Sequence, residues 1–202
     1  MANQEPASAA APASASTRYA IDTRASRLQV RAFASGLLSA LGHSPTISAG
    51  EFSGELTVPG RDPAAGTLSL RVNAASLTVG GDIKEKDRDE IARTMHADVL
   101  ESSTYPEITF SSKRVTAEQT GENQYRVKVS GTMELHGVSR DEEIVAYLTL
   151  SGEQARAYGE FSLLQSNYAI RPISIAGGAL KLKDELKFSF DLSMPRVTAA
   201  AS

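Results

Sequence analysis

One run of the sequence decides the fold: Tyr125-Arg126-Val127-Lys128-Val129-Ser130-Gly131-Thr132-Met133-Glu134-Leu135. Its odd positions are apolar or glycine, and its even positions are charged or carry a hydroxyl group. Side chains of an extended strand point alternately to the two faces of a sheet, so a period of two gives one apolar face and one wet face. The run therefore predicts a strand that covers an apolar interior on one side and meets water on the other.

The same alternation recurs along much of the chain. It is clear at residues 68–74, 144–150 and 186–192, and weaker at residues 28–33, 47–58, 107–115 and 157–164. Turn-forming residues separate several of these runs, among them Pro59-Gly60-Arg61-Asp62 and His136-Gly137. The pattern predicts about eight antiparallel strands that share one apolar face.

Residues 84–100 follow a different period. Ile91, Met95 and Val99 are spaced four apart among charged residues, which is typical of an amphipathic helix. Eight strands and one inserted helix can hide a shared apolar face in a two-sheet sandwich or in a closed barrel. The periodicity is compatible with both.

Composition excludes several classes of protein. The chain has 202 residues, with 21 Lys and Arg against 24 Asp and Glu, so a formal net charge of −3 argues against a nucleic-acid partner. A hydrophobic fraction of 41% favours a folded chain, and no apolar run reaches the roughly 18 to 20 residues of a membrane helix. With no Cys, neither disulfides nor thiolate sites can form.

The two ends of the chain differ from the rest. Residues 1–17 and 198–202 are rich in Ala and Ser and are predicted to be disordered tails, which leaves residues 18–197 as one domain. The first tail lacks the basic and apolar regions of a signal peptide. We expect a cytoplasmic protein, or a periplasmic or secreted one if a leader has been removed.

The common catalytic motifs are absent, and the titratable candidates are few. His136 is predicted to be a surface turn residue and His96 a half-exposed structural one. His43 follows the apolar loop 36–42, which either plugs one end of the core or borders a cavity mouth. Asp184 falls in the inward phase of its strand, so either a bulge turns it outward or it meets a partner near the rim. No metal or cofactor is expected.

Several stretches together resemble the YceI-like family. They are, in order, Tyr19-Ala20-Ile21-Asp22, Gly42-His43, Asp87-Arg88-Asp89, Tyr105-Pro106-Glu107-Ile108-Thr109-Phe110, Gly131-Thr132-Met133-Glu134-Leu135-His136-Gly137-Val138 and Asn167-Tyr168-Ala169-Ile170. The resemblance implies an all-β, lipocalin-like antiparallel barrel that encloses a polyisoprenoid or a similar amphiphilic chain. A barrel of eight strands is compatible with such a ligand, because its interior is just wide enough either to be filled by side chains or to hold one slender ligand.

The resemblance and the alternation together indicate a ligand site. Its expected residues are Phe33, Leu38, Leu41, His43, Phe52, Met95, Val99, Phe110, Val129, Met133, Leu148, Phe161, Tyr168, Phe188 and Phe190. We expect non-catalytic binding, storage or transport of a long isoprenoid or other lipid, with a homodimer as one possible assembly. The alternatives are an enzyme that uses His43 or Asp184 at the cavity mouth, and a barrel with a filled interior that binds a partner through its outer surface.

Overall fold

The computed structural model describes residues 15–35, 45–81, 84–175 and 180–198. Within them one antiparallel sheet contains twelve strands, and eleven of these follow one another in the hydrogen-bonded order β1-β4-β5-β7-β8-β9-β10-β12-β2-β3-β6. The bounds are β1 Ser16–Ala20, β2 Arg27–Ser35, β3 Thr46–Ala49, β4 Phe52–Pro59, β5 Thr67–Asn73, β6 Leu77–Gly80, β7 Glu107–Gly121, β8 Gln124–Leu135, β9 Val138–Ser151, β10 Gln154–Leu164, β11 Ser174–Ile175 and β12 Leu180–Pro195.

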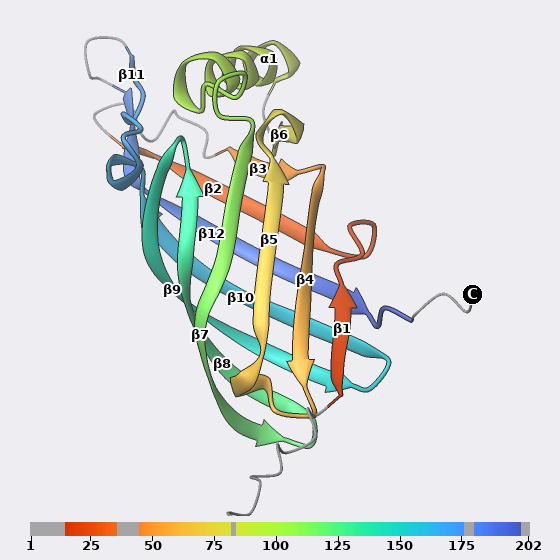
Figure 1. The fold of residues 1–202 in the computed structure, drawn as a ribbon. Coiled ribbons are helices and arrows are strands. Elements are labelled where there is room, and N and C mark those ends of the chain that lie inside the picture. The colour runs from red at the N-terminus through yellow and green to blue at the C-terminus, as the bar shows by residue number, and fades with distance from the viewer. Residues whose placement is uncertain (1–14, 36–44, 82–83, 176–179, 199–202) are drawn as a thin grey trace, which may run out of the picture.

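The sheet curls on itself into a lipocalin-like barrel wall. In Figure 1 the strands β4, β5 and β7 cross in front of β2, β12 and β10. Apolar side chains from both sets of strands line one common interior. At one end β1 meets β12 through an isolated bridge between Tyr19 and Arg196. The sheet is thus a curled and partly open barrel.

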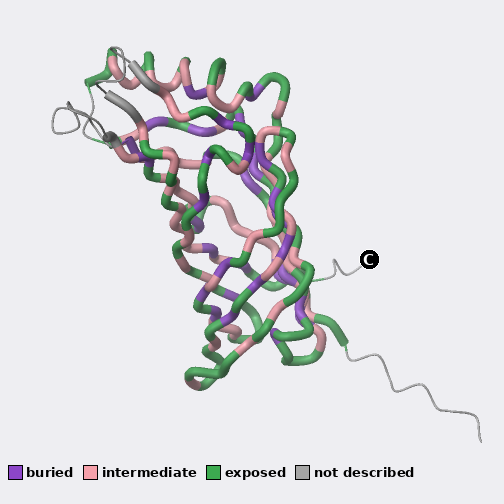
Figure 2. The backbone as a smooth tube through the Cα atoms, turned by 90° about the vertical axis from the view of Figure 1, so that its left-hand side faces the viewer, coloured by how far each residue is buried: buried purple, intermediate pink, exposed green. Residues whose placement is uncertain are grey.

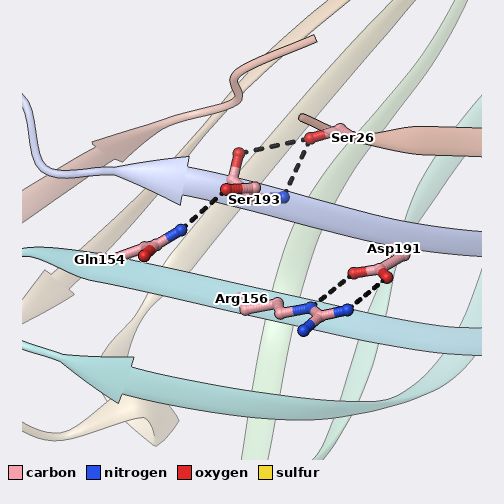
Figure 3. Close-up of polar contacts among 5 residues, drawn as sticks. All are labelled: Ser26, Gln154, Arg156, Asp191 and Ser193. Carbon is pink, nitrogen blue, oxygen red and sulfur yellow. Dashed lines mark hydrogen bonds and ion pairs between the residues drawn. The ribbon is translucent and has the colours of Figure 1, made fainter. Parts of the chain in front are cut away.

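Side chains also tie β2, β10 and β12 near the same end (Figure 3). The Ser26 hydroxyl accepts from the backbone N–H of Ser193 at 2.9 Å, and the Gln154 amide donates to the Ser193 hydroxyl at 2.8 Å. Arg156 donates two hydrogen bonds to Asp191, at 2.8 and 2.6 Å. These side-chain contacts add to the backbone pairing of β12 with β10 and β2 at this end of the barrel.

A helix lies across the opposite end of the barrel (Figure 1). Helix α1 covers Glu85–Thr94 and continues as a π-helical turn over Met95–Val99, so the helix predicted at 84–100 is confirmed. Short 3-10 turns lie at η2 Pro63–Ala65, η3 Ala74–Ser76 and η5 Gln165–Tyr168. No helix in the described part of the chain is long and apolar enough to cross a membrane.

The core follows the predicted alternation. Along β8 the odd positions from Val127 to Leu135 are buried, whereas their neighbours are exposed or half-buried. Figure 2 shows buried or half-buried residues in turn with exposed ones along much of the wall. The barrel is therefore built from strands that have one apolar face and one solvent-exposed face.

The strand count differs from the predicted eight. Residues 47–58 form two strands, β3 and β4, because the chain turns at Gly50 and Glu51. Strands β1, β6 and β11 are too short to show a period of two. Strand β1 starts at Ser16, before the predicted domain start at Arg18, because Ser16 and Thr17 pair through their backbones with Pro59 and Val58.

Candidate functional site

The barrel encloses an apolar cavity of about 160 Å³, which we call the barrel cavity. Residues from both walls line it, and of the described lining residues Thr109 alone has a polar side chain. Its interior is therefore not filled by side chains, and the described part of its lining includes no ionisable group.

A second cavity of about 110 Å³, the cap cavity, lies beneath the helix. The helix, the π-helical turn and the residue after it cover this cavity with Ile91, Met95, Val99 and Leu100. Gln165 is the one polar residue among the lining residues that the structure describes. The two cavities are adjacent, because four residues line both: Val30, Leu77, Ile108 and Leu135. Together they form an apolar interior that extends from the barrel to the helical cap.

The structure places most of the expected site residues on these cavities. Phe110, Val129, Met133, Leu148, Phe161, Phe188 and Phe190 line the barrel cavity. Met95 and Val99 line the cap cavity. The Phe161 and Phe188 rings stack at 4.7 Å between centroids on neighbouring strands. Leu38, Leu41 and His43 lie outside the described residues, so the expected lid is not described.

Three expected residues lie elsewhere. Phe33 is on the outer face of β2, where the Arg31 guanidinium lies 5.7 Å from its ring centroid. The reason is the strand phase, because Leu28, Val30 and Ala32 occupy the inner face. Phe52 is buried in the core without lining either cavity. Tyr168 is also buried away from the lining.

Tyr168 instead takes part in a polar contact. Its hydroxyl donates to Glu142 Oε1 at 2.8 Å, and its side chain is fully buried. Burial, followed by this hydrogen bond to a carboxylate, raises the pKa of Tyr168 well above its ordinary value. The hydroxyl therefore stays protonated, and remains a donor, throughout the physiological pH range.

His136 is in a turn, as predicted, but it is not a surface residue. Its side chain is only 12% exposed, and its ring lies 4.5 Å from the ring of Tyr105. Its Nδ1 lies 3.3 Å from the Tyr168 carbonyl oxygen, and its Nε2 lies 3.7 Å from Glu101 Oε1. The positive φ angles of His136 and Gly137 close the two-residue β8–β9 hairpin and direct the ring inward.

The other two titratable candidates have structural partners. His96 Nε2 lies 3.0 Å from the Leu77 carbonyl oxygen, which agrees with a structural role. The register of β12 shifts between Leu182 and Leu186, where the bulge was expected, and Asp184 accepts from the N–H and hydroxyl of Ser166. Among the residues the structure describes, no group of three His, Asp or Glu side chains could hold a metal ion.

Much of the cavity lining lies outside the expected set of site residues. Leu68, Leu70 and Val72 on β5 line the barrel cavity, and Ala146 and Ala157 do so from β9 and β10. The same alternation that predicts the strands also places these residues on the inner face, but the expected site includes only some of the inward positions. Gln165, which donates to the Lys183 carbonyl oxygen at 2.9 Å, had no local signal.

Comparison with solved structures shows the same fold. BcnA of Burkholderia cenocepacia matches with a TM-score of 0.64 at 17% identity, over 86% of this chain and 98% of that one. A polyisoprenoid-binding domain of Saccharophagus degradans matches with a TM-score of 0.64 at 19% identity, over 89% and 98%. The YceI protein of Campylobacter jejuni matches with a TM-score of 0.54 at 15% identity, over 76% and 85%.

A sequence comparison assigns the family. No curated protein matches the chain. The model of the YceI-like domain, however, matches residues 19–194, which is nearly all of the described barrel. The curled antiparallel wall, the helical cap and this match lead to one conclusion: the chain belongs to the YceI-like family.

Proposed function

We propose that the protein binds a long apolar amphiphile, a polyisoprenoid or a related lipid, in its two adjacent cavities. One observation is central: among the residues that the structure describes, neither lining includes an ionisable side chain, and each includes a single polar residue. Such a lining offers no nucleophile, base or metal ligand, but it gives an apolar chain a dry environment.

The energetics favour a chain over a compact ligand. Removing apolar surface from water contributes about 0.8 kcal/mol for each buried CH₂ group. Affinity therefore grows with the length of chain that the connected cavities accept. Width is limited by the aromatic wall, where Phe161 and Phe188 stack. The site selects length and width, and several lipids of one shape would fit it.

The family supports the same proposal. The Saccharophagus degradans structure that shares this fold is described as a polyisoprenoid-binding domain. A polyisoprenoid is a long, branched and unsaturated apolar chain, which suits a lining of Leu, Val, Ile and Phe side chains. We infer a binding or transport role without catalysis, in which the ligand leaves chemically unchanged.

Native mass spectrometry of the purified protein, followed by organic extraction, tests this proposal. We expect a lipid to co-purify and to be recovered intact. A lipid can also be added to the purified protein before extraction. Recovery of a chemically altered product of that added lipid would favour an enzyme instead. Protein that takes up neither lipid nor a fluorescent fatty-acyl probe would contradict the proposal.

A pair of variants tests the location of the ligand. Ala157→Phe adds a ring inside the barrel cavity, whereas Ser162→Phe adds the same ring on the exposed face of the same strand. We expect Ala157→Phe to abolish probe binding while the protein remains folded by circular dichroism. Ser162→Phe should bind like the parent. Equal binding by both variants would exclude the barrel cavity.

The compartment and the oligomeric state are further proposals. We propose a cytoplasmic protein, or a periplasmic or secreted one if a leader has been removed, and fractionation of cells that express the complete native gene tests this. A homodimer is testable by native mass spectrometry at several protein concentrations.

A further inference from the structure

Strands β9 and β10 separate part of the way along the barrel. Their pairing covers Gln154–Tyr158 of β10 and ends at Tyr158 opposite Tyr147. Beyond this point β9 still pairs with β8 as far as Val138, and β10 still pairs with β12 as far as Leu164. Residues 138–146 of β9 and 159–164 of β10 thus form a pair of facing edges without a ladder, which we call the seam.

Gly159 marks the start of the seam. A Cβ atom at this residue would lie 2.7 Å from the Val145 carbonyl oxygen and 2.9 Å from Phe190 Cζ. The two strands are therefore still in close contact at Gly159. Beyond it they are joined through the 3-10 turn η5, which follows β10 directly.

Side chains, and not a strand ladder, hold η5 against β9. Tyr168 Oη donates to Glu142 at 2.8 Å, Arg140 donates to the Asn167 carbonyl oxygen at 3.2 Å, and His136 contacts the Tyr168 carbonyl oxygen. On its other side, η5 is joined to β12 by Gln165 and Ser166. Movement of η5 away from β9 would break the first three contacts and leave every strand ladder intact.

The seam borders both cavities. Ile144 and Phe161, on its two facing edges, line the barrel cavity. Gln165 of η5 and Ile170 just after it line the cap cavity. An opening between η5 and β9 would therefore connect both cavities to the outside.

The outer border of the seam is apolar at its two ends, whereas Glu143, Glu160 and Ser162 are exposed between them. Among the described residues only four large hydrophobic side chains are exposed, and three of them, Tyr147, Tyr158 and Leu164, lie at its two ends. Tyr147 and Tyr158 stack at 5.3 Å between ring centroids and are nearly half exposed. Exposed aromatic pairs give an apolar chain a surface to contact before it enters the protein.

We propose that the seam is a lateral portal through which the apolar chain enters and leaves the cavities, with η5 as its gate. The proposal rests on the proposed function, since a portal needs a ligand. It assigns a role to Tyr168, Glu142, Arg140 and His136, none of which lines a cavity. The side-chain contacts keep the gate closed, and the exposed tyrosine pair receives the chain.

A covalent link across the seam tests the proposal directly. Because the chain has no Cys, Arg140→Cys with Asn167→Cys creates a unique pair for a short bis-maleimide reagent. Lys128→Cys with Glu143→Cys is the matched control, because it replaces a 3.0 Å ion pair across β8 and β9, which stay fully paired. The measurement is the rate at which each loaded protein transfers a fluorescent fatty-acyl or isoprenoid probe to phosphatidylcholine vesicles.

The release rate is expected to change in opposite directions before and after linking, compared with the parent. Unlinked Arg140→Cys/Asn167→Cys should release the probe several-fold faster than the parent, because one gate contact is lost. After linking, the same variant should release the probe at least tenfold more slowly than the parent. The control pair should stay within twofold of the parent in both states. Release at the unlinked rate from the linked variant, with equilibrium retention as in the parent, overturns the portal and leaves the binding function standing.

Two further results complete the test. A parent protein that retains no probe overturns the proposed function and the portal together. If the double variant fails to fold, Tyr168→Phe serves instead, since it removes one gate hydrogen bond with little change of shape. We expect at least threefold faster release from it, with Tyr125→Phe, on β8 and away from the seam, unchanged. Equal release by Tyr168→Phe and the parent contradicts the gate.

Discussion

The barrel wall at β8 and the corner at η5 enclose the same apolar interior but are held in different ways. Strand β8 pairs with β7 on one side and β9 on the other along its whole length. The η5 corner is held by Tyr168, Arg140 and His136 through single side-chain contacts. Backbone ladders do not depend on side-chain identity, so the wall can keep an empty apolar face, whereas the corner depends on particular residues.

The substitution with the largest expected effect on the free energy of unfolding lies in the barrel wall. Phe110 is 3% exposed and lies between Leu70 and Met133 on neighbouring strands. Phe110→Ala should lower the free energy of unfolding by about 3 to 5 kcal/mol, because buried apolar area is lost and the cavity enlarges. Urea denaturation measures the change. Tyr147→Ala, at an exposed site, is the control and should change it by less than about 1 kcal/mol. Equal effects would show that wall packing does not stabilise the barrel.

A smaller effect on the free energy of unfolding is expected at Gly159, where the seam begins. In Gly159→Ala the new methyl group would lie 2.7 Å from the Val145 carbonyl oxygen, so backbone must shift. We expect a loss of about 2 kcal/mol in the free energy of unfolding. Gly80→Ala on β6 is the matched control, since its Cβ would meet nothing closer than 3.6 Å. A neutral Gly159→Ala variant would mean that the two strands are not closely packed there.

The corner itself should respond to the loss of one hydroxyl group. Tyr168→Phe removes the donor to Glu142 and should lower the free energy of unfolding by about 1.5 kcal/mol at neutral pH. The pKa of Tyr168 is raised in the folded state, so its hydroxyl contributes stability below about pH 10, where the unfolded residue also stays protonated. That contribution falls as the pH rises above 10.

The difference between parent and Tyr168→Phe should therefore shrink as the pH increases above 10. Denaturation curves of both proteins at pH 7 to 11 measure it, and the subtraction removes the titration of other groups. A difference that does not change with pH would show that the hydroxyl is not buried in the folded state.

The walls of the barrel could be predicted from the sequence because their cause is local. The period of two in residues 125–135 and the period of four in Ile91, Met95 and Val99 both reflect which face is buried. The resemblance to a known family then favoured a barrel over a sandwich. Where the local pattern was weak, as at Phe33, the assignment of its inward face was wrong, because a shift of one residue exchanges the faces.

The corner could not be predicted, because its contacts join residues that are distant in sequence. His136 meets the Tyr168 backbone, and Tyr168 meets Glu142, and no periodic pattern connects these positions. The end of β9–β10 pairing at Tyr147 and Tyr158 is likewise a property of strand twist and crossing. The motifs around His136 and Tyr168 were noticed in the sequence, but only the fold shows that they touch.

The smallest effect should come from the end where β2, β10 and β12 are tied. Arg156 donates two hydrogen bonds to Asp191 (Figure 3), and this pairing outweighs partial burial and lowers the pKa of Asp191. A carboxyl group whose pKa is lower in the folded state contributes stability above its unfolded value of about 3.9. The contribution is lost as the pH falls through the folded-state pKa, which is the opposite direction to Tyr168.

Asp191→Asn should therefore cost less than about 1 kcal/mol at pH 7, because both side chains are more than a third exposed and solvent screens the pair. The cost should decrease at high ionic strength, and it should also decrease as the pH falls below the unfolded value. Thermal unfolding at pH 2 to 7, with Glu122→Gln in the β7–β8 turn as control, measures it. If the closing end is weakened by acid and the η5 corner by alkali, the two regions depend on different ionisable groups. If Asp191→Asn instead costs as much as Phe110→Ala, the barrel is held at its closing end more than by its apolar wall.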